Sequence, residues 1–181
     1  MQQQIQKGLE EMRIVMDRPL IGSSTKPIAV ELENGQRGRI HRWFHRNETR
    51  PSVNPRYDVN FLVKSTDTSY EFFQESFSVR KGHSWRISKD RRAIARVISV
   101  YSPREKYRVE LHGRNLPAVS IVASWNGSGD ICCDGEKIGE TKRSGFLLNP
   151  TYTIETDCPD NMDAGLCAGL AMAFWSAFHV G

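Results

Sequence analysis

The chain has 181 residues with a formal net charge of +4, and hydrophobic residues make up 39% of it. This length fits one domain with a single core. The composition excludes a coiled coil, a collagen and a disordered chain, and a mean hydropathy of −0.50 excludes a protein with many membrane spans. A charge this small does not require nucleic acid as the partner.

The N-terminal segment has neither an apolar core nor a small-residue cleavage site, so it does not resemble a secretory signal peptide. We therefore expect a cytoplasmic protein, with residues 1–11 as a polar arm and residues 12–181 as one domain. The four cysteines form no C-x-x-C motif and have no histidine at zinc-finger spacing. We expect them to be reduced and structural: Cys132, Cys133, Cys158 and Cys167.

From about Arg13 to Asp157, short runs of β-branched and aromatic residues alternate with polar residues. Turn signals separate these runs, a pattern that predicts an all-β sandwich or barrel of roughly a dozen strands. We expect two strands to point these residues inward: Tyr107, Val109 and Leu111 on one, and Val119, Ile121, Ala123 and Trp125 on the other. The turn signals are Asn34-Gly35, Ser65-Thr66-Asp67, Lys81-Gly82, Lys89-Asp90, Asn126-Gly127-Ser128-Gly129, Asp134-Gly135 and Asn149-Pro150.

A weak internal repeat runs through this region. Each unit has a turn, a strand with a small residue in its middle, a loop, and a strand that opens near a tyrosine. The small residues are Gly38, Ala95 and Gly139. We interpret each unit as a hairpin in which the small residue lets another segment pack closely against the strand.

The run from Ala164 to Phe178 carries no charge and is rich in Ala, Leu and Met, which predicts a helix over residues 161–178. Asp160 or Asn161 is expected to cap its N-terminus. Fifteen residues rise about 22 Å, whereas a bilayer core is about 30 Å thick. We therefore favour a helix inside the domain, with no transmembrane span. A tail anchor or an interfacial helix is the alternative.

One stretch resembles the tubby C-terminal-like superfamily, which includes the phospholipid scramblases and the LURP-one-related proteins. It runs from Asp134-Gly135 through Tyr152-Thr153-Ile154 to Asp163-Ala164-Gly165-Leu166. The segment Ile87 to Leu111 resembles an earlier hairpin of the same family. The resemblance implies a closed antiparallel barrel of about twelve strands around a hydrophobic C-terminal helix, and it implies lipid contact as one function. The chain lacks the Pro-rich N-terminal region and cysteine cluster of the scramblases.

Basic residues are concentrated in two runs, over residues 37–56 and 81–96, which lie in corresponding units of the repeat. Arginine suits bidentate phosphate contacts, and the interleaved aromatics Trp43, Phe44 and Trp85 suit lipid or bases. A solvated, salt-bridged exterior is the alternative interpretation. The first run also holds His41, His45, Arg46, Arg50 and Arg56. The phosphate or lipid site that we predict consists of Arg37, Arg39, Arg42, Lys89, Arg91 and Arg92.

Signals for catalysis are sparse. The sequence has no G-x-S-x-G, P-loop, H-E-x-x-H or dinucleotide fingerprint, so we expect no enzyme and no cofactor. His41 and His45 would lie about 13 Å apart on a strand, which disfavours a metal site there. Asp157, Asp160 and Asp163 fit helix capping better than calcium binding.

We therefore expect a non-enzymatic module that contacts anionic, phosphoinositide-type phospholipid through a basic face and is peripheral at the membrane. The alternatives are a protein-interaction scaffold of unknown partner, a scramblase-like or dispersed-site enzymatic activity, and nucleic-acid binding, which the sequence disfavours. The sequence leaves the oligomeric state open.

Overall fold

A computed structural model describes residues 11–19, 24–32, 35–45, 58–78, 80–102, 105–145, 150–159 and 161–178. Within these ranges the chain forms twelve strands and one helix, which confirms the predicted fold class. Most of the expected N-terminal arm, residues 1–10, lies outside the described residues, and Glu11 already belongs to the first strand. The elements are β1 (Glu11–Asp17), β2 (Ile28–Glu31), β3 (Arg37–Phe44), β4 (Val59–Lys64), β5 (Ser69–Ser78), β6 (Gly82–Lys89), β7 (Arg92–Ser102), β8 (Glu105–Gly113), β9 (Val119–Ala123), β10 (Gly129–Cys133), β11 (Glu136–Ser144), β12 (Thr151–Asp157) and α1 (Ala164–Phe178).

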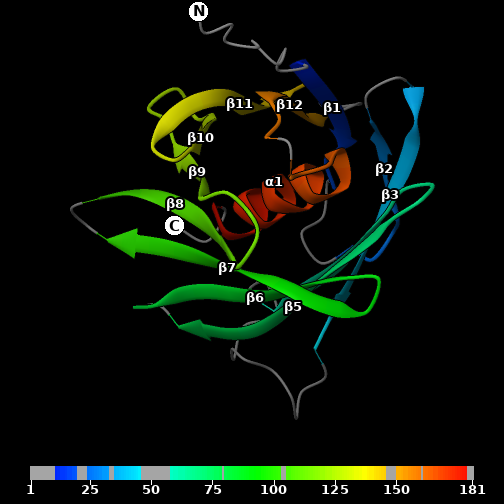
Figure 1. Ribbon diagram of the computed structural model, residues 1–181, viewed down its shortest axis with the longest axis horizontal. Helices are drawn as coiled ribbons and strands as arrows, with labels where there is room; N and C mark the ends of the chain where they lie inside the picture. Colours follow the sequence, from blue (N-terminus) through cyan, green and yellow to red (C-terminus); the bar gives the residue numbers. More distant parts are fainter. Residues whose placement is uncertain are drawn as a thin grey trace, which may run out of the picture.

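The strands form one closed antiparallel barrel in which each strand pairs with its neighbour in the chain (Figure 1). β1 pairs with β12 along its whole length, from Glu11 opposite Asp157 to Asp17 opposite Thr151. This pairing closes the sheet, so each described strand has a hydrogen-bonded neighbour on both sides. Hairpin connections allow this simple order, because antiparallel neighbours need only short turns.

The helix α1 lies inside the barrel, surrounded by the strands (Figure 1). Its Phe174 and Trp175 are 0% and 1% exposed, and it contacts β1, β4, β5, β7, β8 and β9. A helix that is apolar all round requires burial on every side, and the barrel provides it. Trp175 keeps its one polar group satisfied by donating from Nε1 to Thr141 Oγ1 at 2.9 Å. Among the described residues no helix is long and apolar enough to cross a membrane.

The helix begins later than the sequence suggested. It starts at Ala164, and its cap is Asp163, whose Oδ1 accepts from the Leu166 backbone N–H at 2.9 Å. The prediction of Asp160 or Asn161 as the cap was therefore wrong. Asp163 wins because it is the last residue before the uncharged run, so its carboxylate satisfies an N–H group of the first turn.

The expected inward faces are correct in part. Val109, Leu111, Val119 and Ile121 are buried in the core, as their alternation predicts. Trp125 is 95% exposed, so its assignment to an inward face was wrong. The strand β9 ends before Trp125, and the residue lies in the following turn, where the alternation no longer determines the direction of a side chain.

Two tight turns lie where the sequence predicted them. Asp134 and Gly135 have φ angles of 50° and 88°, and Asp90 and Arg91 have 47° and 71°. Two consecutive positive φ values are typical of the turns that join antiparallel strands with the correct twist. The small residue Gly139 permits close strand packing, because a Cβ there would lie 2.2 Å from the Glu155 carbonyl oxygen on β12.

A further close approach joins the helix to the barrel wall at Gly169. A Cβ added at Gly169 would lie 2.2 Å from the Phe72 ring, whereas one at Gly165 would lie 3.2 Å from the Tyr70 ring. Alanine favours a helix over glycine by about 1 kcal/mol at both positions. A comparison of alanine variants at the two positions therefore separates the effect of helix propensity from the effect of packing against the barrel wall.

We predict that Gly169→Ala lowers the free energy of unfolding by roughly 1–3 kcal/mol, because Phe72 and the backbone must shift. Gly165→Ala is expected to change it by less than about 1 kcal/mol. Urea denaturation of both variants checks this. If Gly169→Ala were as stable as Gly165→Ala, the helix would not be held tightly inside the wall.

A histidine is buried in the wall of the barrel on β6. His83 is 3% exposed, stacks on Trp85 with ring centroids 4.9 Å apart, and lies 3.2 Å from Gln74 Nε2 through Nδ1. Gln74 Oε1 accepts from the Val59 N–H, so the amide nitrogen faces the histidine and Nδ1 accepts. Burial lowers the pKa of His83 to about 4.

We predict that His83 contributes to acid unfolding. Its pKa is about 4 when folded and about 6.5 when unfolded, so its contribution is complete above pH 6.5 and is lost as the pH falls toward 4. The loss reaches about 3 kcal/mol. Denaturation at a series of pH values should show a smaller decrease over this window for His83→Phe. Equal decreases in both proteins would contradict the assignment.

Candidate anion-binding site

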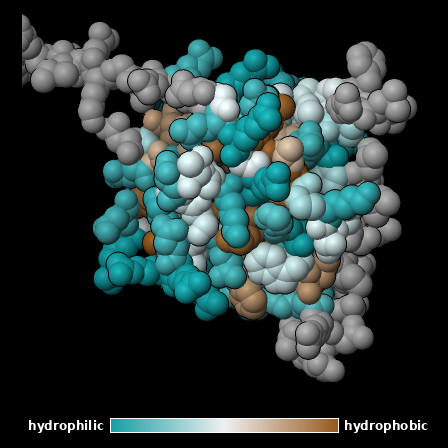
Figure 2. All heavy atoms as spheres, turned by 90° about the vertical axis from the view of Figure 1, so that its right-hand side faces the viewer, coloured by the Kyte–Doolittle hydropathy of each residue, from teal (hydrophilic) through white to brown (hydrophobic). Residues whose placement is uncertain are grey.

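The two ends of the barrel differ, and the helix defines them. We call the end at which α1 begins the cap end, because Asp163 lies there, and the opposite end the far end. Alternating strand directions bring the starts of β3, β5 and β7 and the ends of β4 and β6 to the cap end. Viewed from the side on which α1 begins, the surface is mostly hydrophilic, with small hydrophobic areas between (Figure 2).

Two of the predicted site residues, Arg37 and Arg39, lie on the outer face of β3 and are exposed. Arg39 is the direct cross-strand partner of Lys64 at the end of β4. Both side chains are exposed, and they are on the same face of the sheet because they are directly opposite. Lys64 is not among the predicted residues, since it stands apart from both basic runs in the sequence.

Arg42 does not belong to this surface. It is 6% exposed, and its Nη2 donates to the Ser24 carbonyl. Side chains alternate along β3, so a residue three positions after Arg39 points to the opposite face. Burial lowers the pKa of Arg42. The prediction that Arg42 joins Arg39 on one contact surface is therefore corrected.

Lys89 lies at the cap end but is engaged within the molecule. Its Nζ is 3.4 Å from Asp163 Oδ2 and 5.1 Å from the centre of the Tyr70 ring. Tyr70 donates its hydroxyl to the same carboxylate oxygen at 2.6 Å, and burial together with this hydrogen bond raises its pKa well above the usual value. Asp163 thus joins the helix start to β5 and β6.

Arg91 and Arg92 are exposed in the tight turn and at the start of β7. The pairing of neighbouring strands places them in the same rim as Arg39: Lys64 lies opposite Ser69 on β5, and the Asp90 N–H donates to the Ser69 carbonyl. Four strand spacings separate β3 from β7, or about 19 Å along the wall. We call this set the basic arc: Arg37, Arg39, Lys64, Arg91 and Arg92.

None of the basic arc residues forms an ion pair with a described carboxylate. Other cations on the strands are held by acids. Arg86 and Arg96 both contact Glu75, with the closer pair at 2.8 Å, and Lys137 lies 2.7 Å from Asp130. The arc cations are therefore exposed without a close ion pair, although Glu31 lies directly opposite Arg37 and Asp90 precedes Arg91.

The remaining parts of the two basic runs do not join the arc. His83 is buried, and Trp85 is 0% exposed and donates Nε1–H to the Val59 carbonyl at 2.9 Å, so the expectation that Trp85 contacts a ligand was wrong. Trp43 and Phe44 are half-buried at the far end of β3. The other arginines of the first run lie outside the described residues: Arg46, Arg50 and Arg56.

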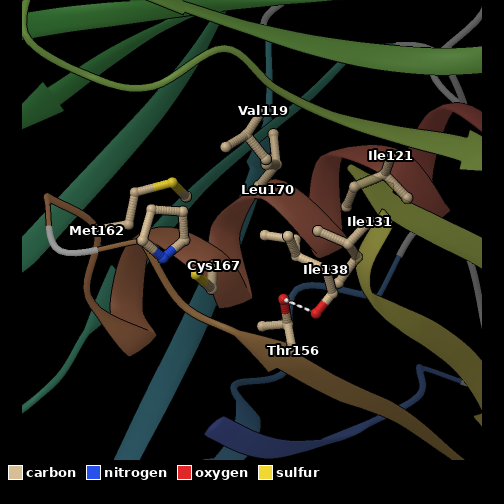
Figure 3. A pocket seen from close by; sticks show the side chains of 9 residues that line it. Val119, Ile121, Ile131, Ile138, Thr156, Met162, Cys167 and Leu170 are labelled. Atoms are coloured by element: carbon tan, nitrogen blue, oxygen red, sulfur yellow. Dashed lines mark hydrogen bonds between the residues drawn. The ribbon is translucent and has the colours of Figure 1, made fainter. Parts of the chain in front are cut away.

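A small apolar pocket lies in the interior of the described part of the chain. It lies between α1 and strands β9 to β12, where Val119, Ile121, Leu170 and Cys167 point into it (Figure 3). The volume of the pocket open to the centre of a water molecule is about 10 Å³, which is enough for about one water. Small-molecule sites have volumes of about 300–1,000 Å³, so this pocket belongs to the packing of the core.

Residues considered for metal binding have structural contacts instead. His45 Nε2 lies 3.0 Å from the Gln74 carbonyl oxygen, and Asp163 caps the helix. Within the described ranges no three His, Cys, Asp or Glu side chains gather as a metal site would require. Asp160 lies outside those ranges.

Comparisons with protein-family models, with curated protein sequences and with solved structures found no match.

We predict that Asp163→Ala lowers the free energy of unfolding by about 2 kcal/mol, because it removes the helix cap and the acceptor of Tyr70. The partly exposed contact with Lys89 adds little. Asp163→Asn keeps an oxygen for the cap and should lose clearly less. Thermal and urea denaturation measure the difference. Equal losses would show that the cap contributes nothing.

Proposed function

We propose that the protein is a non-enzymatic binding module that contacts anionic phospholipid headgroups of the phosphoinositide type through the basic arc. The observation that carries the proposal is the set of five exposed cations at one end of the barrel, none of which forms an ion pair with a described carboxylate. Arginine donates two parallel hydrogen bonds to a phosphate, and lysine adds a point charge. Phosphoinositide headgroups carry several phosphates and match such a rim.

The pairing of Arg39 with Lys64 supports an anionic ligand. Like charges directly opposite each other on neighbouring strands destabilise a sheet, and their Cβ atoms are about 4.5–5.5 Å apart. The register makes these two residues direct partners. A phosphate held between the two side chains would accept from both and remove their repulsion, so the pair is favourable only with an anion present.

The turn at Arg91 gives independent support. Its φ of 71° is a left-handed conformation, which glycine and asparagine adopt with less strain than arginine. Arginine at this position therefore costs stability relative to glycine. Strain of this kind is concentrated at functional positions. The exposed guanidinium at the tip of the β6–β7 hairpin fits a role in contact with a partner.

On the sequence resemblance we propose a relationship with the tubby C-terminal-like superfamily. The closed barrel around an apolar helix supports this proposal. In this proposal the protein acts in the cytoplasm and is peripheral at the membrane. The cap end would face the lipid headgroups, and binding would be electrostatic and reversible. In the alternative scaffold hypothesis, an acidic protein would bind the same cations. The vesicle experiment below distinguishes the two hypotheses.

The test is sedimentation with phosphatidylcholine vesicles that contain or lack phosphatidylinositol 4,5-bisphosphate. We expect wild-type protein to bind only the anionic vesicles, more weakly as the salt concentration rises. Arg39→Gln with Lys64→Gln should reduce the affinity about 30-fold, because each cation near a membrane contributes about 1 kcal/mol. The same variant should be at least as stable as wild type, because the repulsion is gone.

The matched control is Arg80→Gln with Lys81→Gln, which removes two exposed cations from the turn at the far end. This control should bind as wild type does. Absence of binding by wild type at low salt would overturn the lipid proposal and favour a protein partner. Equal losses in the control and the Arg39, Lys64 variant would reject the basic arc as the site.

A further inference from the structure

Two cysteines meet where the chain bends from β12 into α1. The Sγ atoms of Cys158 and Cys167 lie 3.6 Å apart, and neither residue is in a disulfide. Cys158 follows the last residue of β12, and Cys167 lies in the first turns of the helix. A tight bend brings them together, since the Met162 N–H donates to the Pro159 carbonyl at 2.9 Å.

The two sulfurs are in van der Waals contact but not at bonding distance. Two bonded sulfurs are about 2.05 Å apart, so the thiols must approach by roughly 1.5 Å. The apolar pocket lies directly beside Cys167 and is also lined by Met162 and Pro159, the residues of the bend (Figure 3). That unfilled space gives the bend room to move as the sulfurs approach each other.

We propose that Cys158 and Cys167 form a reversible disulfide, with a small-molecule disulfide such as oxidised glutathione as the oxidant. The Cys158 thiolate attacks one sulfur of the oxidant, and a mixed disulfide forms as one glutathione thiolate leaves. Cys167 then gives up its proton, attacks the Cys158 sulfur and releases the second glutathione. Two protein thiols are oxidised and one glutathione disulfide is reduced to two thiols.

The environments of the two thiols set this order. Cys158 is half-buried and its Sγ donates to the Met162 carbonyl at 3.3 Å, whereas Cys167 is 8% exposed, so Cys158 is the thiol nearer to solvent. The hydrogen bond with Cys158, and then burial, raise the pKa of the Cys167 thiol. The thiolate is the attacking species, so Cys167 is the slower nucleophile and acts second, when its partner sulfur is already in contact.

The bond would fix the start of the helix to the barrel wall. The ring it closes contains Asp163, so the cap and the contact with Tyr70 would both lie inside the constrained segment. A ring of this size removes enough disorder from the unfolded chain to raise the Tm by about 5 °C or more. Oxidation would therefore tighten the cap end without any change in the barrel strands.

The experiment exposes folded, fully reduced protein to glutathione buffers of increasing oxidised fraction and counts the free thiols. We expect two of the four thiols to disappear together, peptide mapping to join Cys158 to Cys167, and the Tm to rise until a dithiol reductant is added. The variant Cys132→Ser with Cys133→Ser should behave in the same way, whereas Cys158→Ser should lose both the cross-link and the rise in Tm.

Three results would overturn the proposal. The first is four free thiols in the folded protein across the whole series of buffers. The second is glutathione that stays attached to Cys158 with no second step. The third is a bond to Cys132 or Cys133, or between two chains. The mapping of wild-type protein distinguishes these results even if the Cys158→Ser variant does not fold.

Discussion

The burial of one apolar helix by a closed sheet is the interaction on which the structure depends. A barrel of twelve strands satisfies its own backbone hydrogen bonds through closure, and the helix does so internally, so the apolar side chains of wall and helix can meet in one core. Small residues allow the close fit. Gly169 touches the Phe72 ring, and Trp175 is stacked on Tyr152 with ring centroids 4.9 Å apart. We therefore expect the wall and the helix to unfold as one cooperative unit.

The direction of the helix gives the barrel two different ends. At the cap end the helix start, through Asp163, is joined to Tyr70 on β5 and Lys89 on β6. The neighbouring rim carries the basic arc, whose cations form no ion pair with a described acid. The ion pair with Asp163 holds Lys89 in place, whereas the residues of the basic arc are exposed on the surface. The proposed lipid contact therefore does not require any opening of the core.

Sequence patterns predicted the strands and the buried helix because both signals are local: alternation along strands and an uncharged run of helical length. They left a sandwich or a barrel open, and the family resemblance implied the closed barrel. Alternation also explains why the prediction for Arg42 was wrong, because residues three positions apart on one strand, such as Arg39 and Arg42, point to opposite faces. Other features depend on information that the sequence does not display. The position of Lys64 beside Arg39 requires the register of β3 on β4. The end of β9 before Trp125 depends on competition between neighbouring segments that packing decides. The cap is different, because Asp163 is visible in the sequence as the last residue before the uncharged run.

Hydrogen–deuterium exchange of the native protein tests the enclosure of the helix most directly. If α1 fills the barrel, its amides exchange only through global unfolding, so those of Leu170 to Phe174 should be among the slowest and should match the free energy of unfolding from urea. Helix amides that exchange as fast as those of the exposed turn at Asn126 would contradict the account, because the helix would then leave the barrel while the sheet stays folded.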